Sequence, residues 1–178
     1  QLLAIARKTK RRVHVLHVTT AEELELLREA RDLASVEVTP QHLTLASPEC
    51  YERLGSLAQM NPPIRSARHR EALWAAVASG LVDVLGSDHA PHTLEEKAKP
   101  WPQSPSGMPG VQTLVPIMLD HVHHGRLSLE RFVDLTSAGP ARLFGIQRKG
   151  RIALGYDADF SLVDLKAQRT ITNEWSKS

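Results

Sequence analysis

A carboxylate with two histidines close by follows a short apolar segment near the middle of the chain. Asp88 comes directly after residues 81–87 (LVDVLGS), and His89 and His92 follow it. Aspartate is disfavoured inside strands, and a carboxylate at a buried strand end must be paired, hydrogen-bonded or bound to metal. With a histidine from a second strand end, it suits a hydrolytic metal site that makes hydroxide available near neutral pH. A capping aspartate in a strand-to-helix turn is the alternative, and the spacing alone leaves both open.

Two histidines stand three positions apart in a β-branched segment near the start of the chain. We predict a strand over residues 12–18 (RVHVLHV). Side chains alternate between faces along a strand, so His14 and His17 would point to opposite sides and could not bind one metal together. His17 lies nearer the carboxyl end and is therefore the candidate metal ligand. A structural histidine is the alternative.

Two further segments contain groups suited to holding a polar ligand. Residues 61–65 (NPPIR) put the amide of Asn61 and the guanidinium of Arg65 on a rigid loop, which suits a planar amide or a carboxylate. Residues 106–110 (SGMPG) could offer backbone N–H groups to a ligand. Each signal is weak alone, because both compositions are also common in ordinary turns.

A histidine-rich stretch near the end of a predicted helix has the composition of a metal-binding tract. His121, His123 and His124 precede Gly125. Cationic side chains suit the carboxyl end of a helix, where the helix dipole and solvent account for them. We therefore do not expect these histidines to bind metal.

Short apolar segments alternate with amphipathic ones, a pattern typical of a parallel α/β fold. Strands are predicted at residues 12–18, 36–39 and 81–87, and helices at residues 1–9, from 20 onward, 67–79, 111–124, 128–137 and 140–144. Irregular segments are predicted at residues 40–66 and 93–110, and two short strands around a turn at residues 150–164. The series fits a doubly wound sheet or part of a (β/α)8 barrel. Both place chemistry at the carboxyl ends of the strands.

The composition excludes several classes of protein. The 178 residues have a formal charge of +2 and no basic stripe with interleaved aromatics, so nucleic-acid binding is not expected. The single cysteine, Cys50, rules out an intrachain disulfide. No apolar run approaches the ~18 residues that a membrane-spanning helix needs. The sequence begins at Gln1 inside a predicted helix, without a methionine or an N-cap, and we therefore interpret the chain as truncated.

Taken in order, these segments resemble the cyclic amidohydrolases. Residues 14–20 (HVLHVTT) are similar to that family's sixth barrel strand, whose second histidine binds metal, and residues 37–43 (EVTPQHL) to its seventh. Residues 86–92 (GSDHAPH) are similar to the eighth strand, whose aspartate binds metal and acts as acid and base. Residues 149–160 resemble the small β domain into which chains of this family return.

The resemblance implies an α/β fold in two parts. Residues 1–148 would form the C-terminal portion, strands 6 to 8, of a (β/α)8 TIM-like barrel. Residues 149–178 would form part of a small composite β-sandwich domain. A full barrel needs about 250 residues, so this chain could supply only part of one.

Within this superfamily, three details resemble the dihydroorotases more than the allantoinases or hydantoinases. Asn61 matches the asparagine that dihydroorotases use on substrate, and His92 matches the histidine that contacts the substrate carboxylate. Residues 93–97 resemble the acidic stretch after that histidine. The resemblance also puts Ser106 and Gly107 in the substrate-contacting loop, although Ser106 departs from the phenylalanine often found there.

The activity implied by this resemblance is metal-assisted hydrolysis of a cyclic amide, with one or two zinc ions in each full-length site. His17 and Asp88 would bind metal, and Asp88 would take a proton from water and pass it to the departing nitrogen. The reaction would reversibly link dihydroorotate and N-carbamoyl-L-aspartate in pyrimidine biosynthesis. The substrate would be bound by Asn61, His92, Ser106 and Gly107.

Further expectations concern the whole protein. The family's remaining metal ligands would precede Gln1, and a catalytic zinc typically has three protein ligands plus water, so we expect the 178 residues alone to be inactive. We expect the full-length protein to be a cytoplasmic homo-oligomer that takes a small-molecule substrate and contacts neither nucleic acid nor membrane. The alternatives are an allantoinase- or hydantoinase-type cyclic amidase, a non-catalytic dihydroorotase-like partner of aspartate transcarbamoylase, and an unrelated α/β binding domain.

Overall fold

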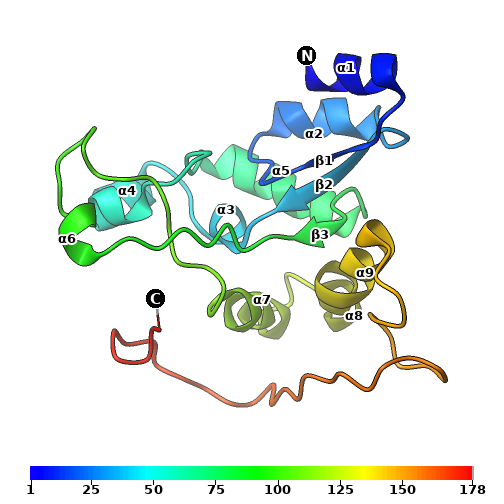
Figure 1. The fold of residues 1–178 in the computed structure, drawn as a ribbon. Coiled ribbons are helices and arrows are strands. Elements are labelled where there is room, and N and C mark those ends of the chain that lie inside the picture. The colour runs from blue at the N-terminus through cyan, green and yellow to red at the C-terminus, as the bar shows by residue number, and fades with distance from the viewer. Residues whose placement is uncertain (178) are drawn as a thin grey trace.

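Three short parallel strands lie side by side in the order in which they occur along the chain. β1 (Val13–Val15), β2 (Ala34–Val38) and β3 (Val84–Leu85) form this sheet in the computed structural model, which describes residues 1–177 (Figure 1). β1 pairs with β2, and β2 pairs with β3, both in parallel. Because all three strands run in one direction, their carboxyl ends share one edge of the sheet.

Helices connect the strands and continue beyond the last of them. They are α1 (Leu2–Thr9), α2 (Ala21–Arg28), α3 (Pro40–Thr44), α4 (Glu49–Leu54), α5 (Ala67–Ala78), α6 (Leu94–Lys97), α7 (Leu114–His123), α8 (Leu129–Val133) and α9 (Gly139–Phe144). A 3₁₀ turn covers Gly55–Ala58, and a π-type turn, Asp134–Ala138, joins α8 to α9. Within residues 1–177, no helix has the length and apolar character needed to cross a membrane.

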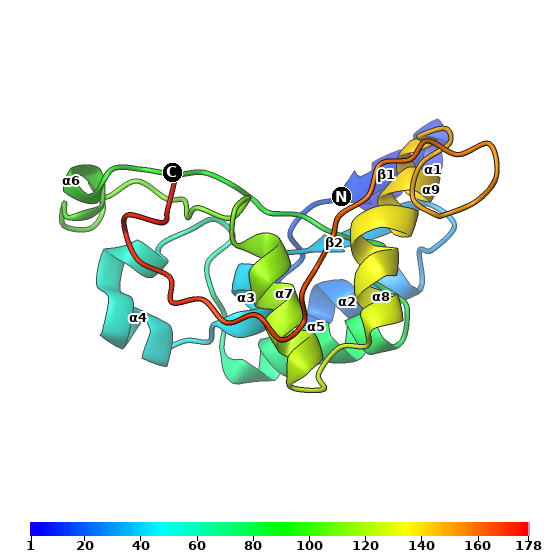
Figure 2. The same cartoon turned by 90° about the horizontal axis from the view of Figure 1, so that it is seen from below.

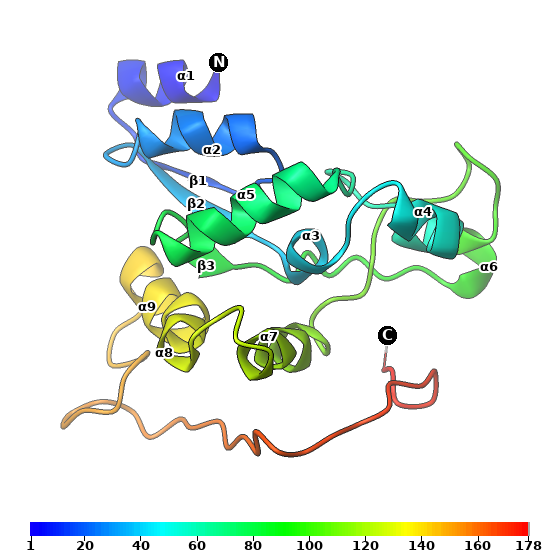
Figure 3. The same cartoon turned by 180° about the vertical axis from the view of Figure 1, so that it is seen from behind.

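α2 and α5 lie on one face of the sheet, and α7, α8 and α9 lie beyond its β3 edge. Figure 3 shows α2 and α5 in front of the strands, and Figure 1 shows the same strands in front of α5 from the opposite side. α7, α8 and α9 follow one another past β3, as Figures 1 and 3 show. This arrangement leaves the carboxyl edge of the sheet facing the loops that contain α4 and α6 (Figure 1).

The alternation of residues along β2 decides which face of the sheet the helices cover. Val36 and Val38 are fully buried and pack with apolar side chains of α2, α5 and α7. Ser35 and Glu37 alternate with them in sequence and point to the other face. There His14 places Nδ1 at 2.8 Å from the Ser35 hydroxyl and Nε2 at 3.3 Å from the Glu37 carboxylate. The sheet therefore has an apolar face against the helices and a polar face opposite.

The predicted strands have the right order, but two of them are shorter than predicted. The strand expected over residues 12–18 ends at Val15, and that expected over residues 81–87 is only Val84–Leu85. β2 limits β3 at its carboxyl end, because Leu85 pairs with Val38, the last residue of β2. β1 ends although β2 continues: its last pair is Val15 with Val36, and the positive φ of His17, 37°, takes the chain out of the extended conformation. The chain leaves β2 after Val38 to begin α3.

The prediction that residues 40–66 and 93–110 are irregular is wrong in part. α3 begins at Pro40, a first helical position where proline loses no hydrogen bond, and the Thr39 side chain accepts the N–H of His42. α6 begins after Thr93, which forms a capping box with Glu96. Short helices with good caps therefore occupy segments whose prolines suggested loops.

The two strands predicted for residues 150–164 are absent. Residues 149–177 contain no strand and run past α8 and α7 (Figure 2). A strand needs a neighbouring backbone with which to pair, whereas here the Tyr156 N–H bonds locally to the Ala153 carbonyl at 3.1 Å. The division into a barrel portion and a small β domain stays a prediction.

Candidate active site

His17 and Asp88 both lie at the carboxyl edge of the sheet. His17 follows the end of β1, and Asp88 follows the end of β3. Both have a left-handed backbone, with φ of 37° and 43°, which is uncommon for residues other than glycine and is concentrated at functional sites. The expectation that His14 and His17 occupy opposite faces of one strand is wrong, because β1 ends before His17.

The Glu37 carboxylate connects the ends of β1 and β3. Its Oε1 accepts the backbone N–H of His17 at 3.3 Å, and its Oε2 lies 3.3 Å from Nε2 of His14. A Cβ added to Gly86 would lie only 2.3 Å from the Glu37 carboxyl carbon. His17 and the segment leading to Asp88 therefore meet around this one carboxylate. Sequence reasoning assigned no role to Glu37, although an acidic residue inside a buried β-branched run was a usable signal.

His42 connects this edge to the turn that contains Asn61. Its Nε2 lies 2.9 Å from the Pro62 carbonyl, which can only accept, so Nε2 donates and Nδ1 accepts from the Thr39 hydroxyl at 2.7 Å. Burial lowers the pKa of His42, because the charged imidazolium would lose hydration. His17 and Asp88 lie close enough to act electrostatically on His42, in opposite directions. Sequence reasoning left His42 unassigned.

Three loop segments carry the remaining predicted site residues, and hydrogen bonds join them. His92 donates from Nε2 to the Ser106 carbonyl at 3.3 Å, and its Nδ1 lies 3.4 Å from the Glu96 carboxylate. The Gly107 N–H donates to the Gln59 carbonyl at 3.0 Å. The structure thus brings His92, Ser106 and Gly107 together and ties them to the segment before Asn61.

Gly107 is required where the loops approach each other. Its φ is 147°, and an added Cβ would lie 2.3 Å from the Ala90 carbonyl oxygen. The Ala90 N–H donates to the Met108 carbonyl at 3.0 Å, so the backbone at Ala90 lies directly against the backbone at Gly107 and Met108. Asn61 is exposed, and its side chain has no hydrogen-bond partner within residues 1–177.

The other histidines have local partners. The Nδ1 of His69 accepts the N–H of Ala21 at the start of α2 at 3.1 Å. His89 accepts the N–H of Gly110 at 3.1 Å. His121 packs edge-on against the Trp74 ring, with centroids 4.8 Å apart. These contacts give the three side chains structural roles.

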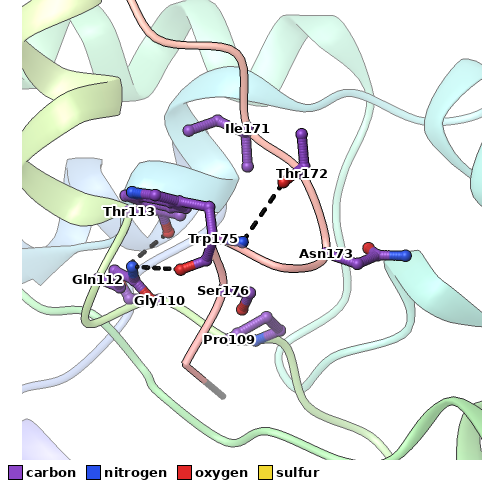
Figure 4. Close-up of a pocket in the computed structure, with 9 residues that line it drawn as sticks. All are labelled: Pro109, Gly110, Gln112, Thr113, Ile171, Thr172, Asn173, Trp175 and Ser176. Carbon is purple, nitrogen blue, oxygen red and sulfur yellow. Dashed lines mark hydrogen bonds between the residues drawn. The ribbon is translucent and has the colours of Figure 1, made fainter.

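A pocket of about 230 Å³ lies away from the predicted site residues. It is formed by the loop before α7 and the end of the tail (Figure 4). The Gln112 amide donates to the Trp175 carbonyl at 3.0 Å, and the Lys177 N–H donates back to the Gln112 side chain at 2.9 Å. None of the six residues predicted to bind metal or substrate lines this pocket, so we do not assign the site to it.

The donors at the sheet edge fit only part of a catalytic metal centre. His17 and Asp88 offer one imidazole and one carboxylate, ligand types that zinc accepts. Within residues 1–177 no three His, Cys, Asp or Glu side chains converge as metal ligands. A catalytic zinc typically takes three protein ligands and a water. His17 and Asp88 would therefore be two of the donors that such a centre requires.

The sequence match decides the family. The model of the Amidohydrolase family matches residues 3–178, which is nearly the whole chain. The chain belongs to the Amidohydrolase family. This membership, with the parallel sheet and its helices, indicates a TIM-barrel-type α/β fold. Which strands of such a barrel β1, β2 and β3 represent stays a prediction.

Curated relatives and solved structures from this family are similar to most of the chain. A dihydroorotase of Halobacterium salinarum is 46% identical over 159 residues, covering 89% of the chain and 37% of the relative. A dihydroorotase of Pyrococcus abyssi is 42% identical over 173 residues, 97% of the chain and 41% of the relative. The L-hydantoinase structure from Arthrobacter aurescens is 37% identical, with a TM-score of 0.83 over 89% of the chain and 37% of that structure. The chain spans about two fifths of the length of the proteins it matches.

Proposed function

We propose that the full-length protein, meaning the gene product that contains these 178 residues, is a dihydroorotase. The observation that carries the proposal is the placement of His17 and Asp88 at one sheet edge, in a chain 46% identical to a curated dihydroorotase over 159 residues. Because the chain covers 37% of that relative, the activity belongs to the larger protein.

Asp88 is the proposed acid and base. As the water oxygen bonds to the ring carbonyl carbon, Asp88 takes the proton, and it returns this proton to the ring nitrogen as the C–N bond breaks. In the reverse reaction the same group takes the proton from the nitrogen and returns it to the departing water. Two hydrogen bonds hold the backbone just before Asp88. The Gly86 N–H donates to the Val38 carbonyl of β2 at 3.0 Å, and the Gln41 amide of α3 donates to the Ser87 carbonyl at 2.9 Å.

His17 and Asp88 are also proposed as two ligands of zinc, with one or two ions in each full-length site. When bound, zinc would polarise the ring carbonyl and lower the pKa of water. Glu37 orients His17 through its backbone N–H, and such supporting contacts keep metal ligands in place. The remaining ligands would come from other parts of the full-length protein.

The loop segments are the proposed substrate contacts. Asn61, His92, Ser106 and Gly107 lie on segments that hydrogen bonds connect. Dihydroorotate and N-carbamoyl-L-aspartate both carry carboxylates, and an imidazole N–H suits a carboxylate. To bind one, His92 would exchange its bond to the Ser106 carbonyl for a bond to the substrate. The exposed amide of Asn61 is free to bond to an amide or carboxylate.

A hydantoinase-type activity is the second candidate, since the similar solved structures include an L-hydantoinase with a TM-score of 0.83. The two substrates differ at one group that the site can recognise. Dihydroorotate carries a carboxylate, whereas a simple hydantoin carries none. A site that places His92 for a carboxylate leaves the imidazole without that partner when a hydantoin binds.

Turnover by the purified full-length protein separates these functions. Dihydroorotate, allantoin and a hydantoin without a carboxylate are assayed side by side, with the zinc content measured. We expect kcat/KM for dihydroorotate to exceed the other two by about a hundredfold or more. A preference for the hydantoin would favour the second candidate. Zinc binding without turnover of any of the three would point to a non-catalytic relative.

A further inference from the structure

Lys97 is a buried cation with no acidic partner. It is the last residue of α6, and only 4% of its surface is exposed. Its ammonium donates to three backbone carbonyls: Gln59 at 2.9 Å, Pro105 at 2.9 Å and Gly107 at 3.1 Å. No carboxylate in the described chain, residues 1–177, pairs with it. The proposed reaction does not use this group.

The Lys97 ammonium has as many N–H donors as there are carbonyl acceptors around it. An ammonium has three N–H groups, and each of the three carbonyls takes one. Burial lowers the pKa of Lys97, because the charge leaves water. An apolar side chain of similar length would leave these carbonyls without their shared donor, which is unfavourable in a buried place.

The three carbonyls belong to the two segments that carry proposed substrate contacts. Gln59 lies two positions before Asn61, and Pro105 and Gly107 flank Ser106. The Gln59 carbonyl accepts both the ammonium and the Gly107 N–H. The Gln59 amide also donates to the Ser106 hydroxyl at 3.3 Å. Lys97 therefore lies where the Asn61 segment meets the Ser106 turn.

α6 fixes Lys97 and His92 in one unit. Thr93 and Glu96 form the capping box, and the same Glu96 carboxylate lies 3.4 Å from Nδ1 of His92. The carbonyl of Lys97 accepts the hydroxyls of Ser56 and Ser104. A single helical turn thus connects the His92 side chain to both loop segments.

We propose that Lys97 is a positioning residue for the cyclic-amide substrate. Its ammonium sets the separation of Asn61 from Ser106 and Gly107, without touching the substrate. The inference rests on the proposed function, because it takes these residues as substrate contacts. A group that aligns ground-state contacts changes KM more than kcat, which distinguishes this role from that of Asp88.

The test compares Lys97→Met with Lys99→Met in the full-length protein. Lys99 is exposed and lies two positions further along the same loop, so it is the matched control for loss of one positive charge. We expect Lys97→Met to raise KM for dihydroorotate about tenfold or more, with kcat changed less than threefold and zinc content unchanged. Lys99→Met should leave both constants within about twofold of the wild type.

Unchanged KM and kcat in folded Lys97→Met, beside an active wild type, would overturn the inference. An inactive wild type would instead contradict the proposed function. If Lys97→Met does not fold, Lys97→Arg decides, because it keeps the charge but presents planar donors that cannot converge on three carbonyls in the same way. A raised KM in Lys97→Arg supports the inference, and an unchanged KM contradicts it.

Discussion

Gly86 lies against the Glu37 carboxylate at the edge of the sheet. A Cβ at this position would be 2.3 Å from both the carboxyl carbon and Oε1 of Glu37. That carboxylate accepts the backbone N–H of His17 and contacts the ring of His14. Because glycine has no Cβ, Gly86 leaves room for the Glu37 carboxylate, which in turn holds the predicted metal ligand His17.

Gly86→Ala in the full-length protein should separate activity from stability. Glu37 is a flexible side chain and can move aside, so we expect unfolding free energy to fall by only about 1 kcal/mol. Its hydrogen bond to His17 would be lost, and loss of such a supporting contact typically reduces metal affinity or activity about 10- to 100-fold. Zinc titration and kcat measure the second effect, and thermal unfolding the first. Wild-type zinc affinity and kcat in this variant would contradict the role given to Glu37.

Residue types and strand ends allowed His17 and Asp88 to be predicted as candidates. Glu37 and His42 were not assigned, because their partners are distant in sequence. Glu37 contacts His17, and His42 contacts Pro62, each across 20 residues. A single sequence shows no pairing of that kind, so these contacts needed the structure.

At the scale of the element, the segment around β3 carries one aspartate before its start and one after its end. Asp83 precedes the strand and accepts two bonds from Arg31, at 2.7 and 2.8 Å, and the Val36 N–H at 2.7 Å. Asp88 follows the strand at the opposite edge of the sheet. In TIM barrels the carboxyl edge carries the chemistry and the amino edge carries stability. The two aspartates therefore have different expected roles.

Asp83→Asn should lower stability without impairing the chemistry. Partial burial by itself would raise the pKa of Asp83, but the bonds from Arg31 and the Val36 N–H outweigh it and lower that pKa. The ionised carboxylate thus stabilises the fold above its unfolded pKa of about 3.9, and this contribution is lost as pH falls through the lower folded pKa. We expect a loss of about 1–3 kcal/mol at pH 7. The difference from wild type should shrink below about pH 4 in denaturant unfolding of the full-length protein; a pH-independent difference would contradict the ion pair as its source.

Helix caps were the most predictable local features, and short helices the least. Thr20 and Glu23 have the three-residue spacing of a capping box, and they form one at the start of α2. Thr93 and Glu96 have the same spacing, yet the prolines around them favoured a loop. α6 is a single turn held by its side-chain contacts, and such tertiary support cannot be predicted from local propensity.

At the scale of the whole molecule, the sheet is polar on one face and apolar on the other. The order of strands and helices was predictable because each apolar segment leads into an amphipathic one. The strands expected in residues 150–164 are absent, since the local sequence does not supply the partner backbone that a strand needs. The family match covers residues 3–178, while the chain spans about two fifths of its curated relatives. The chemistry must therefore be measured on the full-length protein.

The most direct test compares Asp88→Asn with Asp83→Asn in that protein, with kcat for dihydroorotate as the readout. The two changes are chemically identical and lie on opposite sides of β3, so each controls for the other. We expect Asp88→Asn to lower kcat by about 10²- to 10⁴-fold while the protein stays folded. Asp83→Asn should keep kcat within about threefold of wild type despite its lower stability. Wild-type kcat in folded Asp88→Asn would contradict the assignment of Asp88 as the acid and base.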